Sequence, residues 1–132
     1  MAGALGIELV DLPDVFSRAY AVSNHLPNIL STRGLLDSSL FARMRSDATF
    51  INTGRGAQVI ERDLIAVLAD WPGLTAFLDV TWPEPPEKES PLYGLPNVSL
   101  SSHIAGSIND EVVRMADDVL EEYGRWERGE NL

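Results

Sequence analysis

Short apolar runs alternate with segments of helical periodicity along most of the 132-residue chain. Five of these runs have the length and composition of β-strands, at 7–10, 20–24, 48–53, 74–80 and 98–101. Between them, helices are predicted at 12–18, at a segment capped by Asp37 or Ser38, and at about 60–69. Such alternation with short connections is typical of α/β folds, in which helices cover both faces of a parallel sheet.

The longest helix is predicted at 107–128. Its apolar residues recur at steps of four and three and draw one stripe, formed by Ile108, Val112, Met115, Val119, Tyr123 and Trp126. Gly129 is a suitable stop for this helix. The stripe predicts packing against a hydrophobic surface, but the pattern does not say which surface that is.

Composition favours one globular domain. The hydrophobic fraction of 45% is ordinary for such proteins. The chain has no cysteine, which excludes disulfides and thiolate zinc sites. A net charge of −10 argues against a nucleic-acid partner, because binding phosphates needs a basic face. No apolar run approaches the roughly 18 residues of a membrane span and no signal-peptide pattern is present, so we expect a cytoplasmic protein.

Three loops that directly follow predicted strands carry reactive side chains. Arg55 lies between Gly54 and Gly56, Glu84 lies between two prolines, and His103 precedes the last helix. Each has an ordinary alternative: a turn with a surface arginine, a proline-rich loop with exposed acids, and a structural histidine. Their common position is more informative, because ligands of parallel sheets bind at the carboxyl ends of the strands.

Arginine, glutamate and histidine together suit the reduction of a 2-oxo acid. The arginine can hold the substrate carboxylate through two hydrogen bonds and polarise the adjacent carbonyl. A protonated histidine can donate a proton to the carbonyl oxygen, and a neighbouring carboxylate favours that protonated form. The hydride must come from a cofactor, because no side chain supplies one.

Several short motifs follow one another through nearly the whole chain: HLP at 25–27, STRGL at 31–35, FINTGRG at 50–56, LDV at 78–80, PEP at 83–85, PL at 91–92, LPNV at 95–98 and SHIAG at 102–106. In this order they resemble the D-isomer-specific 2-hydroxyacid dehydrogenases. That family includes glyoxylate and hydroxypyruvate reductases, phosphoglycerate dehydrogenases and formate dehydrogenases. The resemblance implies a partial Rossmann-like parallel sheet with flanking helices.

The resemblance also implies a role for each matched residue. The catalytic set is Arg55, which binds the substrate, Glu84, which pairs with the histidine, and His103, which acts as acid and base. The cofactor-binding set consists of Pro27, Thr53, Gly54, Arg55, Asp79, His103, Ala105 and Gly106. Among these, Asp79 matches the aspartate that contacts the nicotinamide carboxamide. No metal ligand is implied.

The family's phosphate-binding turn is missing from the sequence. No Gly-x-Gly-x-x-Gly occurs, and Gly3-Ala4-Leu5-Gly6 leads into a predicted strand rather than a helix. We therefore expect residues 1–132 to be the C-terminal portion of an NAD-binding domain without its first βαβ unit. The resemblance implies NAD or NADP as the cofactor of the whole enzyme; we expect this chain not to hold it tightly, and we expect the isolated chain to be inactive. The final helix, without a substrate domain to pack on, is expected to drive homo-oligomerisation or domain swapping.

Two other classes of function compete with a dehydrogenase fragment. One is a non-catalytic remnant that acts as an interaction or oligomerisation module, although the presence of Arg55, Glu84 and His103 argues against it. The other is a hydrolase, which is disfavoured because the chain has no Gly-x-Ser-x-Gly motif. Metal-dependent hydrolysis has even less support from the sequence, because the two histidines are far apart in it.

Overall fold

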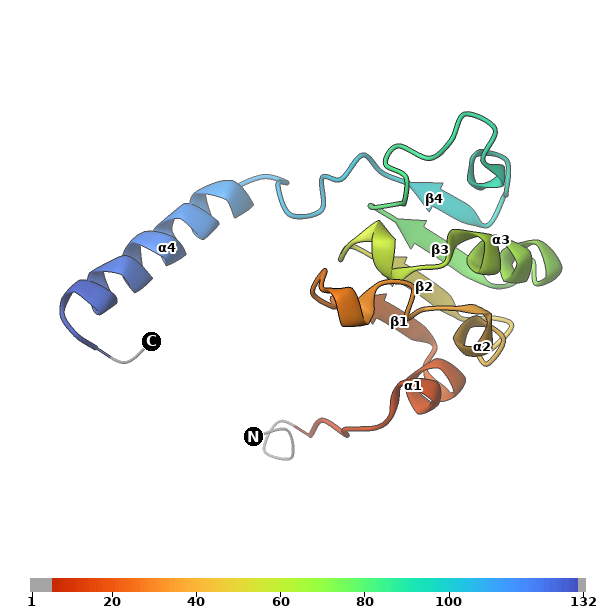
Figure 1. Ribbon diagram of the computed structural model, residues 1–132, viewed down its shortest axis with the longest axis horizontal. Coiled ribbons are helices and arrows are strands. Elements are labelled where there is room, and N and C mark those ends of the chain that lie inside the picture. The colour runs from red at the N-terminus through yellow and green to blue at the C-terminus, as the bar shows by residue number, and fades with distance from the viewer. Residues whose placement is uncertain (1–5, 131–132) are drawn as a thin grey trace. The chain divides into compact units, whose positions relative to one another are not determined.

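The computed structural model describes residues 6–130 and divides the chain into two compact units, Met1–Ser102 and His103–Leu132. The first unit contains a sheet of four strands: β1 (Ala21–Asn24), β2 (Thr49–Asn52), β3 (Thr75–Leu78) and β4 (Val98–Leu100). All neighbouring strands are parallel, in the order β1-β2-β3-β4 (Figure 1). This confirms the predicted α/β fold with a parallel sheet.

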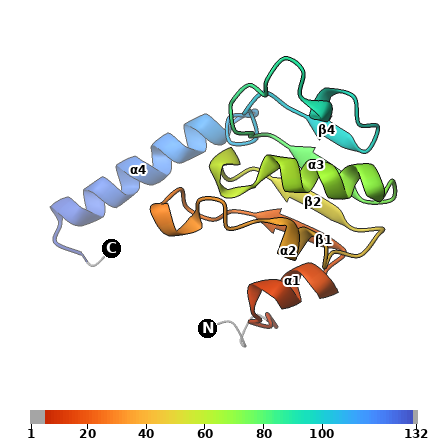
Figure 2. The same cartoon turned by 45° about the vertical axis from the view of Figure 1, so that its right-hand side comes forward.

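Three α-helices connect or precede the strands: α1 (Leu12–Arg18), α2 (Ser38–Phe41) and α3 (Glu61–Asp70). The side chain of Asp37 caps α2 by accepting a hydrogen bond of 3.0 Å from the backbone N–H of Ser39, so Asp37 is the cap among the two candidates, Asp37 and Ser38, that the sequence offers. In α3, Glu61 and Asp63 occupy the first turn, where negative charge is favourable. Within residues 6–102, the helices lie on one face of the sheet (Figure 2).

The core of this unit is built around three phenylalanines. Phe16 of α1, Phe41 of α2 and Phe50 of β2 are at most 1% exposed. The ring of Phe41 lies 5.2 Å from that of Phe50 and 5.7 Å from that of Phe16, in edge-to-face contacts that add to the hydrophobic burial. Phe50 stands at the centre of the sheet, so the helices are fixed over the same strands that carry the site loops.

The opposite face of the sheet is not covered within this unit. Side chains of a strand alternate between faces, and those alternating with the core positions include Ser23, Ile51 and Phe77. Phe77 is 48% exposed, whereas its neighbour Ala76 is fully buried. The prediction of helices on both faces is therefore wrong for residues 6–102.

The strand predicted at 7–10 is also absent. These residues form no regular structure, and Ile7 and Leu9 are largely exposed. A β-strand needs a neighbouring strand to satisfy its backbone hydrogen bonds. The described part of the chain pairs none with this segment, so its apolar composition alone does not make it a strand.

The second unit contains one helix, α4 (Glu111–Glu127). It begins four residues later than predicted, because Asn109 has a φ of +55°, which an α-helix cannot contain. Gly129, at a φ of +71°, ends it by donating its N–H to the Trp126 carbonyl at 2.9 Å, as predicted. No residue of α4 is buried, and the stripe residues Val112, Met115, Val119, Tyr123 and Trp126 are 46–67% exposed. None of the described helices is long and apolar enough to cross a bilayer.

Candidate active site

The carboxyl ends of the parallel strands gather the predicted site residues of the first unit. β1 and β2 end in register at Asn24 and Asn52, and β3 ends opposite Asn52 at Leu78. The segments that follow are the HLP motif, the Arg55 loop and the segment that begins with Asp79. The topology therefore places these three motifs, which are far apart in sequence, along one edge of the sheet.

A hollow of about 360 Å³ lies between the first two of these segments. Its lining includes four predicted cofactor-side residues, Pro27, Thr53, Gly54 and Arg55. The Arg55 side chain is exposed, and its Nη1 donates a hydrogen bond of 2.7 Å to the Gly54 carbonyl. The remaining guanidinium N–H groups give this residue the capacity to bind an anion in the hollow.

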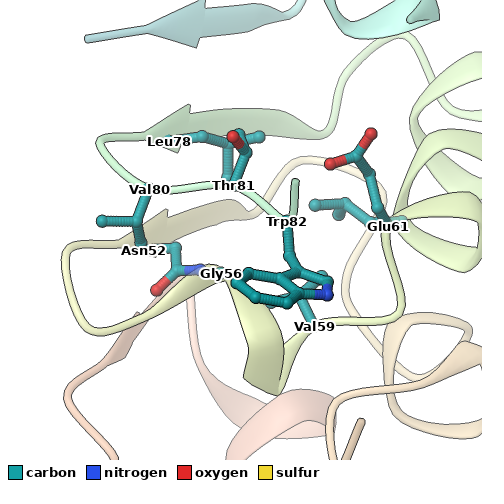
Figure 3. A pocket seen from close by; sticks show the side chains of 9 residues that line it. Asn52, Gly56, Val59, Glu61, Leu78, Val80, Thr81 and Trp82 are labelled. Atoms are coloured by element: carbon teal, nitrogen blue, oxygen red, sulfur yellow. The ribbon is translucent and has the colours of Figure 1, made fainter. Parts of the chain in front are cut away.

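The Arg55 loop is held against the segment after β3 by a backbone contact. Gly56 is buried, and a Cβ atom placed on it would lie 1.9 Å from the Thr81 carbonyl oxygen. Beside this contact is a small cavity of about 10 Å³, lined in part by Val59, Thr81 and Trp82 (Figure 3). That volume holds at most about one water molecule, so the two segments are closely packed.

The aspartate and the glutamate that follow β3 lie in different environments. Asp79 is 6% exposed, donates its N–H to the Asn52 carbonyl at 3.0 Å and accepts a hydrogen bond of 2.5 Å from the Ser101 hydroxyl. Glu84 is exposed, between Pro83 and Pro85. The structure thus fixes Asp79 firmly at the sheet and leaves the Glu84 side chain accessible.

His103 begins the second unit, three residues beyond the end of β4. It is exposed, as are Ala105 and Gly106. Its φ is +57°, in the left-handed region that costs a residue other than glycine about 1–2 kcal/mol. Strained backbone of this kind is often found at functional positions.

The structure adds residues that the sequence reasoning did not find. His25, Leu26 and Asn28 also line the 360 Å³ hollow. Gln58 is fully buried and donates a hydrogen bond to the carbonyl of Pro27, which lines the hollow. The signal in the sequence that could have indicated such buried polar residues is a polar side chain at the last position of a buried strand, as at Asn24 and Asn52. Among the described residues, no group of three or more histidine, cysteine or acidic side chains is placed to hold a metal ion.

One carboxyl near the site has an altered pKa. Burial raises the pKa of Glu61, at the start of α3, above its ordinary value of 4.5. A hydrogen bond from the Ser90 hydroxyl and one from the Trp82 backbone oppose this shift, and the charge of Glu87 adds to it. Glu61 thereby links α3 to the proline-rich segment that carries Glu84.

We expect Glu61 to make the protein less stable as the pH rises. Its folded-state pKa is above the unfolded value, so its favourable contribution is complete below about pH 4.5 and is lost as the pH rises through the raised pKa. In Glu61→Gln this loss should vanish, so the stability of the variant relative to the parent should increase across that window. Urea unfolding at several pH values measures it, with Glu121→Gln on α4 as control. A constant difference between Glu61→Gln and the parent would contradict the assignment.

Comparison with known proteins identifies the family. Residues 2–105 match the family model described as "D-isomer specific 2-hydroxyacid dehydrogenase, NAD binding domain". The chain belongs to this family. The resemblance stated from the motifs is thereby confirmed.

Individual enzymes of the family share about a third or more of their residues with this chain over the matched region. The chain is 41% identical over 106 residues to glyoxylate/hydroxypyruvate reductase B of Klebsiella pneumoniae, covering 80% of this chain and 33% of the reductase. It is 35% identical over 120 residues to D-3-phosphoglycerate dehydrogenase of Mycobacterium tuberculosis, covering 91% and 22%. The chain thus spans between about a fifth and a third of the length of these relatives.

A solved structure confirms the Rossmann-like fold. The NADPH-dependent glyoxylate/hydroxypyruvate reductase of Sinorhizobium meliloti, in complex with NADP and sulfate, superposes with a TM-score of 0.77 at 31% identity. The match covers 96% of this chain and 42% of the reductase chain. The dehydrogenase family is one that uses NAD or NADP, in agreement with the cofactor predicted from the sequence.

Proposed function

We propose that residues 1–132 correspond to the C-terminal portion of the NAD-binding domain of a D-2-hydroxyacid dehydrogenase. The activity proposed for the whole enzyme is reversible hydride transfer between NAD(P)H and a small 2-oxo acid, which becomes a D-2-hydroxy acid. The observation that carries the proposal is the hollow between the HLP and Arg55 segments, with an exposed guanidinium at its wall. A cytoplasmic location is proposed with it, in agreement with the lack of cysteine.

The residues at the hollow fit only one end of a dinucleotide. A Cβ on Gly54 would lie 3.1 Å from atoms of Asn24 and Gln58, so a side chain there would have to displace one of these neighbours by a few tenths of an ångström. Pro27 and Thr53 line the same hollow, where we propose that the nicotinamide ring binds. In contrast, the sequence contains no glycine-rich turn for the pyrophosphate. Asp79, held by Ser101, is proposed to accept hydrogen bonds from the nicotinamide carboxamide.

The proposed chemistry assigns one task to each of three side chains. Arg55 binds the substrate carboxylate by charge-assisted hydrogen bonds. His103, in its protonated form, donates a proton to the carbonyl oxygen, and Glu84 stabilises the positive charge of that imidazolium. NAD(P)H, when bound, would supply the hydride for the carbonyl carbon. In the reverse direction His103 accepts the hydroxyl proton.

We expect the isolated chain to bind NADH weakly and to show no measurable turnover. A dinucleotide that contacts only the nicotinamide side loses the interactions that a helix N-terminus makes with its phosphates. Titration of NADH into the purified chain, followed by fluorescence, should give a dissociation constant far above the micromolar range. Lactate dehydrogenase under the same conditions serves as a positive control. Micromolar affinity would show that this chain holds the phosphates by residues not recognised above.

A second function, an oligomerisation module, is favoured by the exposed stripe of α4. Tyr123 and Trp126 are 58% and 62% exposed, and large apolar side chains gathered on one helix face usually contact a partner. We propose homo-oligomers, with exchange of a helix or strand between copies as one form. Size-exclusion chromatography with light scattering should show a mass that increases with concentration, and Val119→Glu should reduce it. A strictly monomeric profile at high concentration would exclude this function.

A further inference from the structure

Three buried side-chain amides make hydrogen bonds to the backbone of residues that line the hollow. Gln58 is fully buried, Asn52 is 1% exposed and Asn24 is 4% exposed. Asn24 ends β1 and Asn52 ends β2, at paired positions of the sheet, while Gln58 comes from the short helix after Arg55. We call these three residues the amide cluster. Burial of an amide is unfavourable unless its hydrogen bonds are made, so the contacts of each group require an account.

Gln58 uses its whole hydrogen-bonding capacity. Its Nε2 donates to the Pro27 carbonyl at 2.9 Å and also to the Leu26 carbonyl. Its Oε1 accepts from Asn24 Nδ2 at 2.5 Å and from the Arg55 backbone N–H at 3.3 Å. One side chain therefore bonds to the backbone on both sides of the hollow.

The two asparagines complete the same connection. Asn24 Nδ2 donates to Asn52 Oδ1 at 2.9 Å, and Asn24 Oδ1 accepts from the Leu26 N–H at 3.1 Å. Asn52 Oδ1 also accepts from the Gly54 N–H at 3.2 Å, and Asn52 Nδ2 donates to the Arg55 carbonyl at 3.4 Å. These side-chain hydrogen bonds of the amide cluster all end within the cluster or on the backbone of Leu26, Pro27, Gly54 or Arg55.

We propose that Gln58, together with Asn24 and Asn52, is a positioning element that sets the spacing between the HLP segment and the Arg55 loop. Replacing a hydrogen-bonded buried pair by apolar groups of the same shape is often nearly neutral for stability. Stability alone therefore does not require three amides here. The three amides instead make directional hydrogen bonds. A polar network in which every hydrogen bond is made admits only one arrangement of the two backbone segments. The proposal depends on the function proposed above only for the identity of the ligand.

Hydrogen exchange of the full chain, followed by NMR, tests the proposal. In Gln58→Met, which keeps the length of the side chain, exchange at the Arg55 amide should become about tenfold faster or more, since its acceptor is gone. The amides of Phe50 and Ala76, inside the sheet, should change less. Uniform acceleration of all amides, or an unchanged Arg55 amide, would overturn the proposal.

A matched control and a second variant make the result specific. Asn97 donates its amide to the Leu68 and Leu74 carbonyls at 2.9 and 2.7 Å, at the opposite ends of the strands. In Asn97→Leu, hydrogen exchange at the Arg55 amide should therefore not become faster relative to exchange at the amides of the sheet. If Gln58→Met does not fold, Asn24→Ser keeps the bonds from Gln58 to Pro27 and Arg55. It should accelerate the Leu26 amide selectively, and equal acceleration at Arg55 and in the sheet would refute the positioning role.

A ligand titration distinguishes failure of this positioning role from failure of the proposed dehydrogenase function. Millimolar NADH should shift the Thr53 and Arg55 amides in the parent and in Asn97→Leu, and these shifts should be lost in Gln58→Met. If NADH shifts neither amide in the parent, the proposed function fails, while the exchange comparison still decides the role of Gln58. If the shifts persist unchanged in Gln58→Met, the amide cluster does not position the site.

Discussion

Replacing Gly56 by alanine is expected to lower the free energy of unfolding by about 3 kcal/mol or more, at the upper end of overpacking effects. The new Cβ would lie 1.9 Å from the Thr81 carbonyl oxygen and 2.0 Å from its carbon. Both atoms belong to the backbone, so no side-chain rotation can relieve the overlap, and the Arg55 loop must move away from the segment after β3. Urea unfolding followed by circular dichroism measures the loss.

Gly94→Ala is the matched control for this substitution. Its Cβ would meet only the Pro91 carbonyl oxygen at 3.8 Å, an ordinary contact, and its φ of −108° suits any residue. We expect a change within about 0.5 kcal/mol, as for most surface substitutions. Equal stability of the Gly56 and Gly94 variants would mean that the two site loops are not in close contact.

Phe50→Ala is expected to destabilise the protein by about 3 to 5 kcal/mol, the range of buried phenylalanine truncations. Phe50 is fully buried, and its ring contacts those of Phe16 and Phe41 at centroid distances of 6.4 and 5.2 Å. Truncation removes the common partner of α1 and α2 and leaves a cavity under the sheet. Since small domains are stable by only about 5–15 kcal/mol, much of the chain should unfold at moderate urea concentrations.

Phe77 offers the comparison on the opposite face. It belongs to β3, adjacent to β2, but is 48% exposed. Phe77→Ala should therefore reduce stability by about 1 kcal/mol, in proportion to the smaller apolar area that it buries. A loss as large as that of Phe50→Ala would indicate that the uncovered face is in fact packed, for example against a second copy.

Much of the fold follows from local pattern because its elements are short and their signals are local. The helix at 12–18 has the bounds that the pattern predicts, and the cap of the next helix is Asp37, one of the two residues that the sequence offers for it. The prediction of a strand at 7–10 is wrong because strand formation depends on a partner strand, which composition does not reveal. The first turn of α4 was misplaced because the periodic stripe continues through Ile108, while the positive φ of Asn109 is a backbone property.

Only those site residues whose side chains are chemically reactive could be predicted from the sequence. Arg55, Asp79 and Glu84 follow strands, and their types suggest chemistry. Gln58 was not found, because a glutamine in a helical segment has no distinctive pattern, and its role arises from contacts with residues 31 to 34 positions away. The sequence shows Gly56 only as a neighbour of Arg55, whereas the structure shows that its backbone closely approaches Thr81.

The central claim is that the strand ends of this chain carry the nicotinamide and substrate side of a 2-hydroxyacid dehydrogenase site. The most direct test is a residue-resolved NMR titration with NADH and oxamate, an amide analogue of a 2-oxo acid. We expect shifts at Thr53, Arg55 and Asp79, together with His103 and Ala105, and loss of the oxamate response in Arg55→Ala. Shifts confined to the opposite strand ends, near Gly73 and Asn97, or a response of Arg55 without one of His103, would contradict it.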